Sequence, residues 1–129
     1  MLDTSIAIHA RDSNAAILDR LNRYDGIAVL SALSLAELQR GLFKNAADTA
    51  IRQARLELFL EQISVVAFDT PAAEAYGRII AQLGWVKGRD FDRMIAAHAI
   101  SSRSILVTSN EKDFQDIPGL KLENWLAAP

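Results

Sequence analysis

The sequence contains no cysteine and only two histidines, His9 and His98, which are separated by most of the chain. Disulfide bonds, thiolate zinc sites and thiol catalysis are therefore excluded, and a site built from two histidines is not expected. Any bound metal must be held by oxygen. No apolar run approaches the roughly 18 residues needed to cross a bilayer, and the N-terminus has no basic region followed by a hydrophobic one. We expect a soluble cytoplasmic protein with no membrane segment.

The chain also lacks an excess of basic charge, with 14 Lys and Arg against 16 Asp and Glu and a formal net charge of −2. Binding to nucleic acid would therefore depend on local basic patches or on a cation that bridges phosphate. The 129 residues are enough to bury one hydrophobic core, and no repeat, linker or low-complexity tract divides them. We predict a single domain over residues 1–129.

Short apolar runs alternate with amphipathic segments along the chain. The runs at 27–30, 65–68 and 104–108 have the length and composition of strands buried on both faces of a parallel sheet, and 119–122 is a candidate edge strand. The segments between them carry apolar residues at helical spacing. Strands separated by helices indicate an α/β fold, and we predict a three-layer sandwich with a central, mostly parallel β-sheet flanked by helices.

Polar residues stand at the carboxyl ends of the predicted strands, where parallel sheets bind their ligands. The first apolar residues of the chain end at Asp3, and the helix that follows strand 27–30 carries Glu37. The strand at 104–108 leads directly into Asn110. We expect these side chains to face one edge of the sheet.

A helix near residue 90 brings a third carboxylate to the same edge. We expect Asp90 to cap this helix and Asp92 to lie in its first turn, beside a buried stripe that runs from Phe91 through Ile95 to His98. On such a stripe His98 is expected to be a hydrogen-bonded core residue rather than a base. Three carboxylates and an amide at one edge would suit Mg²⁺ or Mn²⁺, because these ions prefer oxygen ligands.

Each of these residues also has a structural interpretation. Ser34 and Glu37 match a capping box, in which the glutamate satisfies backbone donors of its own helix. An aspartate in a first turn, such as Asp92, commonly interacts with the helix dipole, and Asn110 could be an ordinary turn residue. Asp3 is harder to explain in this way, since acids are depleted in strands. A non-catalytic interaction module with helix-capping acids is therefore an alternative.

Four stretches combine these acids with recurring small and apolar neighbours: Leu2–Ser5, Ser34–Gly41, Asp92–Ala99 and Leu106–Phe114. In order and spacing they closely resemble the PIN-domain ribonucleases that serve as VapC-type toxins. The resemblance spans nearly the whole chain. It implies that Asp3, Glu37 and Asp92 are the three acidic, metal-binding residues of the site, that Asn110 takes the fourth position, and that Thr108 lies beside them.

The resemblance further implies a Mg²⁺- or Mn²⁺-dependent endoribonuclease that cleaves structured RNA such as tRNA or rRNA and is inhibited by a VapB-type antitoxin. It also implies a homodimer or a heteromeric complex with the antitoxin. We expect the interface on a predicted helical hairpin, whose exposed apolar residues would be Leu42, Phe43, Leu58 and Phe59. Basic side chains would position the RNA backbone, with candidates Arg11, Arg40, Lys44, Arg52, Arg55 and Arg89.

Two positions depart from the family's pattern. Ser5 stands where asparagine is usual, which is compatible with a side chain that only caps the first helix or orients Asp3. Ser5 also argues against a phosphotransferase of the aspartyl-phosphate type, which needs a second aspartate at this place. Asn110 replaces a frequent aspartate, so it can only position water or a ligand. Two residues precede Asp3, which leaves open a natural start upstream of Met1.

Overall fold

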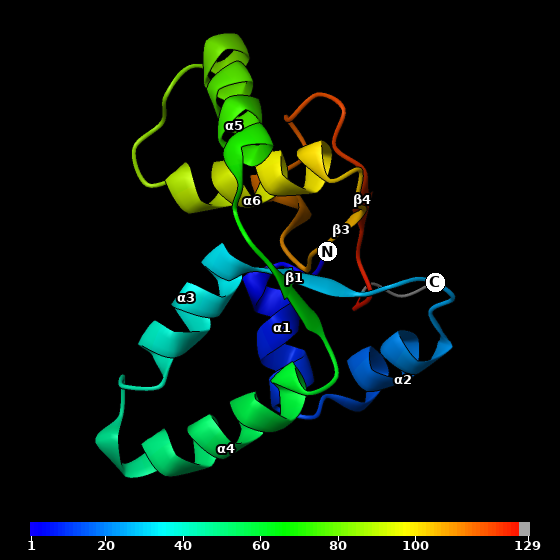
Figure 1. Ribbon diagram of the computed structural model, residues 1–129, viewed down its shortest axis with the longest axis vertical. Coiled ribbons are helices and arrows are strands. Elements are labelled where there is room, and N and C mark those ends of the chain that lie inside the picture. Colours follow the sequence, from blue (N-terminus) through cyan, green and yellow to red (C-terminus); the bar gives the residue numbers. More distant parts are fainter. Residues whose placement is uncertain (127–129) are drawn as a thin grey trace.

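Pairs of helices separated by short strands make up most of residues 1–126, the part of the chain that the computed structural model describes (Figure 1). The strands are β1 (Val29–Ser31), β2 (Ser64–Val66), β3 (Leu106–Val107) and β4 (Leu122–Glu123). The helices are α1 (Thr4–Arg11), α2 (Ala15–Arg23), α3 (Ala32–Gly41), α4 (Thr49–Leu60), α5 (Thr70–Leu83) and α6 (Asp90–Ser101), with 3₁₀ turns η1 (Ala46–Asp48) and η2 (Glu111–Asp113). The predicted domain 1–129 has its last three residues outside the described part.

The start of the chain forms the centre of the sheet. Leu2 bridges Leu30 on one side and Val107 on the other, in parallel register both times. The Leu2 amide donates to the carbonyl of Val29 at 3.0 Å, and the Asp3 amide donates to the carbonyl of Val107 at 2.9 Å. This short segment therefore joins two pairs of strands into one sheet.

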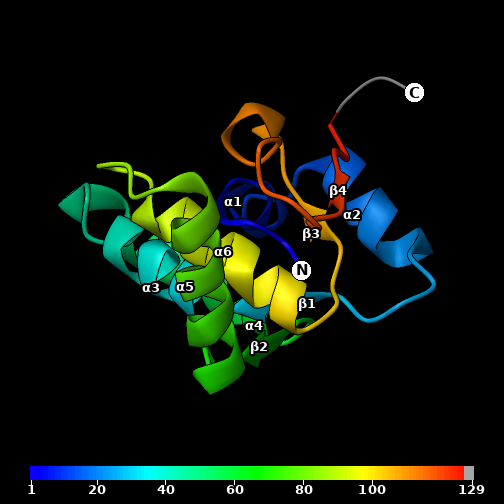
Figure 2. The same ribbon diagram turned by 90° about the horizontal axis from the view of Figure 1, so that it is seen from above.

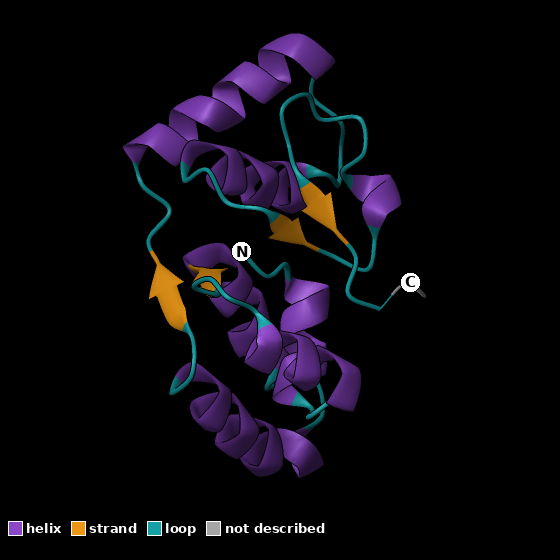
Figure 3. Ribbon diagram, turned by 90° about the vertical axis from the view of Figure 1, so that its right-hand side faces the viewer, coloured by secondary structure: helices purple, strands orange, loops and turns teal. Residues whose placement is uncertain are grey.

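The strand order is β4, β3, N-terminal segment, β1, β2, and every pairing is parallel. Helices α1 to α4 lie on one side of the sheet and the packed pair α5 and α6 on the other (Figures 1 and 3). Seen from above, α5 and α6 cross over the strands (Figure 2). The predicted three-layer α/β sandwich with a parallel sheet is confirmed. Within residues 1–126, no helix is long and apolar enough to cross a membrane.

Neighbouring residues of the sheet face opposite layers. Leu2, Leu30 and Val107 belong to the core beneath α1 to α4, whereas Met1 and Leu106 belong to the core beneath α5 and α6. Side chains alternate between the two faces of a strand, so two or three residues are enough to contribute to both cores. β1 and β3 can therefore be very short and still contribute to both cores. β2, predicted to be buried on both faces, is instead a largely exposed edge strand, with Val65 39% exposed.

The strands are shorter than the apolar runs that predict them. β1 extends to Ser31, while Ile27, at the start of the predicted run, is 84% exposed and precedes the sheet. β3 contains only two of the five residues in the run 104–108. The candidate edge strand at 119–122 is present as β4, but it begins at the last residue of that range.

The helix that carries Glu37 begins earlier than predicted. Ser31 Oγ accepts a hydrogen bond from the Leu33 amide at 3.1 Å and caps α3. Ser34 therefore lies inside the first turn, where its buried hydroxyl has no hydrogen-bond partner within the described residues. The capping-box interpretation of Ser34 and Glu37 is wrong, because the end of β1 sets where this helix starts.

The stripe of α6 is buried at Ile95 and His98, as predicted, but Phe91 is 39% exposed. His98 is a core residue, with its Nδ1 atom 2.9 Å from Ser31 Oγ. Burial lowers the pKa of His98. The predicted capping role of Asp90 is wrong, since α6 begins at Asp90 itself and places this residue in the first turn.

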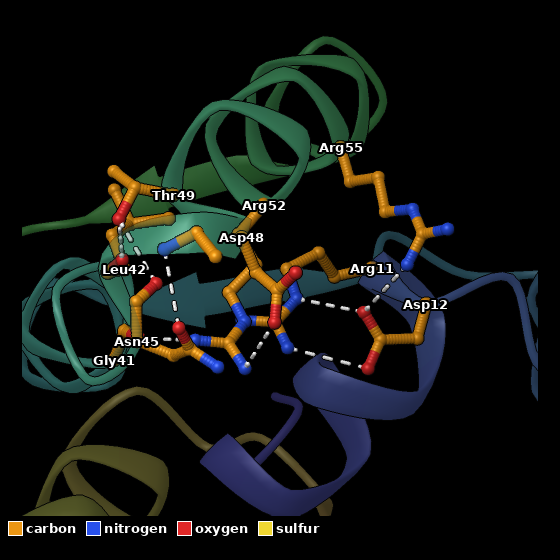
Figure 4. Close-up of polar contacts among 10 residues, drawn as sticks. Arg11, Asp12, Gly41, Leu42, Asn45, Asp48, Thr49, Arg52 and Arg55 are labelled. Carbon is orange, nitrogen blue, oxygen red and sulfur yellow. Dashed lines mark hydrogen bonds and ion pairs between the residues drawn. The ribbon is translucent and has the colours of Figure 1, made fainter.

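Helices α3 and α4 both pack against α1, and polar contacts hold the connection between them (Figure 4). Thr49 Oγ1 donates to the carbonyl of Leu42 at 2.8 Å, and Arg55 lies 3.9 Å from the carboxylate of Asp12 at the end of α1. Leu42 is 3% exposed, so its predicted surface position is wrong. The same correction applies to Phe59, which is 8% exposed.

Leu42 and Leu58 test this arrangement, because one leucine is buried and the other, on α4, is 62% exposed. Leu42→Ala should lower the free energy of unfolding by about 2–5 kcal/mol, since it leaves a cavity in the core. Leu58→Ala should change it by no more than about 0.5 kcal/mol. Urea denaturation of both variants gives the values, and equal losses would contradict the observed packing of α3 against α1.

Candidate active site

Asp3 is buried at the carboxyl end of the central sheet segment, with 5% of its surface exposed. Its Oδ1 atom accepts hydrogen bonds from the Ile6 amide at 3.0 Å and from the Ser5 hydroxyl at 2.7 Å. Its Oδ2 atom accepts a short hydrogen bond from the Thr108 hydroxyl. Burial raises the pKa of Asp3, although these hydrogen bonds act in the opposite direction. The carboxylate is thus oriented from both α1 and β3.

Thr108 and Asn110 reach this carboxylate from the end of β3. Thr108 is completely buried, and its hydroxyl donates to Asp3 while accepting from the Asn110 amide at 2.9 Å. Asn110 therefore supports the site through its backbone, and the residue itself is exposed. Ser5 orients Asp3 through its hydroxyl, which agrees with one of the two roles expected for it.

Glu37 comes to the same edge from α3. Its Oε1 atom accepts a hydrogen bond from Thr4 Oγ1 at 2.6 Å, across 33 positions of sequence. Thr4 directly follows Asp3 at the start of α1, so Glu37 is tied to the segment that carries the buried carboxylate. This long-range contact replaces the local capping role considered for it.

Asp92 lies in a negative field made by the other acids. Its pKa is raised to about 6, first by burial and then by the charges of Asp113, Glu37 and Asp3, while Arg89 lowers it. The influence of one charge on another falls off with distance, so the acids that act on Asp92 lie near it. The structure therefore brings the three predicted acids into one electrostatic cluster.

Asp113 belongs to this cluster, although the sequence analysis does not select it. It is the last residue of η2, and its charge has a larger effect on Asp92 than that of Glu37 or Asp3. The signal that could have identified it is the acidic turn Glu111–Asp113, which begins a few residues after a buried strand. We refer to Asp3, Glu37, Asp92 and Asp113 as the acidic edge.

The chemistry of the acidic edge fits a hard divalent cation. Its donors are all carboxylates. Burial and, after it, repulsion from the neighbouring carboxylates raise the pKa of Asp92, and positive charge would relieve the repulsion. No group of three or more His, Asp or Glu side chains within residues 1–126 is, however, arranged to hold a metal ion. The acids interact through charge in this conformation, and joint coordination requires their side chains to turn toward one another.

An ion pair between the buried Arg93 and the half-exposed Asp116 connects α6 to the segment after η2. Arg93 is 4% exposed and contacts Asp116 through both terminal nitrogens, at 3.3 Å and 3.0 Å. Arg93 follows Asp92 in sequence, and Asp116 lies three residues beyond Asp113. The pair therefore holds the two chain segments that carry these acids next to each other.

The chain is similar over nearly its whole length to known proteins. A family profile described as PIN domain matches residues 1–120. Ribonuclease VapC2 of Rickettsia felis is 37% identical over 132 residues, covering 97% of this chain and 96% of the relative. The tRNA(fMet)-specific endonuclease VapC of Shigella flexneri is 36% identical over 129 residues, with the same coverage. The crystal structure of VapBC2 from Rickettsia felis, bound to a DNA fragment from their promoter, matches with a TM-score of 0.87 and 33% identity over 97% of both chains.

A parallel sheet with carboxylates at the ends of its strands, together with these matches, defines a nuclease of the PIN class. More particularly, the chain belongs to the PIN-domain family as a relative of the VapC ribonucleases. The resemblance carried by its four motifs is thereby confirmed.

The raised pKa of Asp92 makes a prediction about stability and pH. Because the pKa is about 6 in the folded protein and 3.8 for an unperturbed aspartate, the folded state holds this proton more tightly. The stability contributed by protonated Asp92 is therefore lost as the pH rises from about 4 to above 6. At pH 7.5 in EDTA, the free energy of unfolding of Asp92→Asn should exceed that of the wild type by about 1 kcal/mol, after allowance for solvent screening.

This advantage should shrink toward pH 4, where the wild-type carboxylate is largely protonated in the folded state. Urea denaturation at both pH values provides the measurement. Asp19→Asn is the control, because Asp19 lies on the exposed surface of α2. A destabilised Asp92→Asn at pH 7.5 would support the helix-dipole interpretation instead.

The Arg93–Asp116 pair makes a second prediction. Asp116→Ala leaves a buried guanidinium without its carboxylate, so the free energy of unfolding should fall by about 1–3 kcal/mol. Asp19→Ala removes a partner of Arg23 in a fully exposed pair at 2.8 Å and should change it by less than about 0.5 kcal/mol. Equal effects of the two substitutions, measured by urea denaturation, would show that burial of Arg93 does not depend on Asp116.

Proposed function

We propose that this protein is a Mg²⁺- or Mn²⁺-dependent endoribonuclease that acts as the toxin of a VapBC-type system, with residues 1–129 as one nuclease domain in the cytoplasm. The observation that carries the proposal is the acidic edge, in which burial and then the charges of three neighbouring carboxylates raise the pKa of Asp92. Such a cluster destabilises a fold unless a ligand uses it, and a divalent cation is the ligand that these donors suit.

The residues of the acidic edge have distinct parts in this proposal. Asp3, Glu37 and Asp92 would hold the cation, with Asp113 adding negative charge nearby. When bound, the ion supplies positive charge that acidifies water and screens the phosphate during hydrolysis. Thr108 fixes the orientation of Asp3, and its hydrogen bond to the Asn110 amide holds the end of β3 in place. The fixed orientation limits the rearrangement needed for binding.

Structured RNA such as tRNA or rRNA is the proposed substrate. One relative is named a tRNA(fMet)-specific endonuclease, and others are named ribonucleases. The net charge of −2 and the acidic edge both repel a polyanion, so nearby basic side chains must assist the binding of RNA. Among the candidates, Arg89 lies beside Asp92, whereas Arg11 and Arg55 both contact Asp12 at the far end of α1.

A VapB-type antitoxin is the proposed partner, because solved relatives are toxin–antitoxin complexes. A cavity of about 530 Å³ lies between α1, α2 and α4, and Leu18, Leu58 and Phe59 contribute to its lining. Arg11 and Arg55 also line it, so this mixed polar and apolar cavity can receive a segment of a partner protein that carries both apolar and acidic side chains. The exposed residue Phe43, between α3 and α4, adds apolar surface for the antitoxin or for a second copy of the chain in a homodimer.

The nuclease activity provides the direct test. The purified chain, freed of antitoxin, should cleave RNA with Mg²⁺ or Mn²⁺ and not with EDTA. Asp3→Ala and Asp92→Asn should each lower the rate by roughly 100-fold or more. Asp25→Asn is the matched control, because Asp25 is exposed and precedes β1 at the opposite ends of the strands.

Metal binding gives a second readout that does not depend on activity. Mn²⁺ at one hundred times its dissociation constant should stabilise the wild type by about 2.7 kcal/mol, and Asp92→Asn should lose most of this gain. Full cleavage by either active-site variant would refute the assigned residues. A wild type that is insensitive to metal and inactive on RNA would favour the non-catalytic module.

A further inference from the structure

The connection between α5 and α6 presents aromatic and basic side chains next to the acidic edge. It projects from the molecule at the end of α6 that carries Asp92 (Figure 1). Its exposed residues are Trp85 (61%), Val86 (43%) and Lys87, and Phe91 (39%) follows in the first turn of α6. Arg89 in the same connection lowers the pKa of Asp92, so the two groups are near each other. We call residues 84–91 the aromatic loop.

The exposed tryptophan is fixed at its edge. Trp85 Nε1 donates to Asp90 Oδ1 at 3.0 Å, and the same oxygen accepts from the Tyr76 hydroxyl at 2.6 Å. Asp90 belongs to α6 and Tyr76 to α5, so the carboxylate that receives the indole N–H is itself held between the two helices. The indole is therefore anchored at one atom while most of its surface is open to solvent.

Two glycines allow the loop to leave one helix and enter the next. Gly84 has φ of 78° and Gly88 has φ of 82°, in the region that side chains with a Cβ atom rarely adopt. They flank the three residues from Trp85 to Lys87. The projecting shape is thus determined by the backbone at both ends.

We propose that the aromatic loop is a stacking platform for unpaired bases of the RNA substrate. Trp85 and Phe91 stack against bases, while Lys87 and Arg89 contact backbone phosphates. Aromatic side chains bind unpaired bases of any sequence by stacking, and base-paired nucleotides do not offer their faces. The inference rests on the proposed ribonuclease function and narrows its substrate to RNA with unpaired nucleotides beside the cleaved bond.

Charge and position favour RNA over a protein partner at this loop. Lys87 and Arg89 lie between Trp85 and Phe91, and the one acid of the loop, Asp90, accepts hydrogen bonds from Tyr76 and Trp85, so the loop carries a net positive charge in a chain whose net charge is negative. Phosphate binding requires such local positive charge. The loop also borders the acidic edge, where the phosphodiester must bind. The surface of α4, with Ile51 and Leu58 exposed, has the apolar character that suits a protein.

Binding of a labelled RNA oligonucleotide in EDTA tests the platform without cleavage. Trp85→Ala should weaken binding of single-stranded RNA by about 5- to 150-fold, which corresponds to the loss of one base stacked on an aromatic ring. Trp85→Phe should retain most of the affinity, because it keeps an aromatic ring. Ile27→Ala is the control, since Ile27 is also exposed and apolar but precedes β1. A duplex of the same sequence should bind more weakly than the single strand.

Tryptophan fluorescence identifies the contact itself. The sequence has two tryptophans, and the second, Trp125, is only 5% exposed. Single-stranded RNA should therefore quench the fluorescence of the wild type and leave that of Trp85→Phe nearly unchanged. With Mn²⁺ present, Trp85→Ala should raise KM by a larger factor than it lowers kcat, because the loop binds RNA and does not touch the reacting atoms.

The outcomes separate this inference from the proposed function. If the wild type cleaves RNA but Trp85→Ala binds single-stranded RNA as tightly as the wild type, the platform is refuted and the nuclease stands. If Trp85→Ala instead weakens only self-association or binding of the antitoxin, the loop is a protein interface and the platform is also refuted. If RNA quenches Trp85 but no metal supports cleavage, the platform stands and the proposed nuclease fails.

Discussion

The buried carboxylate of Asp3 is the constraint on which the rest of the structure depends. A carboxylate removed from water is stable only when its oxygens are hydrogen-bonded, and this one receives bonds from Ser5, Ile6 and Thr108. These donors are in place only when the first residues of the chain lie between β1 and β3. The hydrogen bonds that stabilise the buried Asp3 carboxylate therefore depend on the order of the strands.

The acidic edge and the hydrophobic core place opposite demands on the fold. Two apolar clusters, one on each side of the sheet, stabilise it, whereas four like charges at the strand ends oppose it. The Arg93–Asp116 pair lies beside this repulsion and ties α6 to the segment after η2. The fold therefore holds the chain segments that carry the acids next to each other, and the carboxylates themselves must reorient to share one cation.

The sequence predicts the layers of the fold and the identity of three acids, because both depend on long-range regularities such as strand runs and motif order. It fails where a local pattern competes with tertiary structure. Ser34 and Glu37 form a plausible capping box, but Ser31 at the end of β1 caps the helix first. Asp113 is overlooked because a 3₁₀ turn after β3, rather than a strand end, brings it to the site.

The spacing of apolar residues also fails to predict which charged residues are buried. Arg93 falls outside the apolar stripe of α6, yet it is buried, because Asp116 from a distant loop supplies a partner for it. Leu42 is buried for a related reason. Both α3 and α4 pack on α1, so a residue near the end of α3 is covered by helices that its own sequence pattern does not reveal.

The central place of the N-terminal segment also affects how the protein is made. Asp3 and Thr108 are 105 positions apart, so their contact closes a loop that contains most of the chain. Contacts of such large sequence separation form late and slow folding. During synthesis the first residues leave the ribosome early, but they gain their second strand neighbour only after β3 has emerged. The nascent chain therefore carries no assembled acidic edge until β3 and Thr108 have been synthesised and have joined the N-terminal segment.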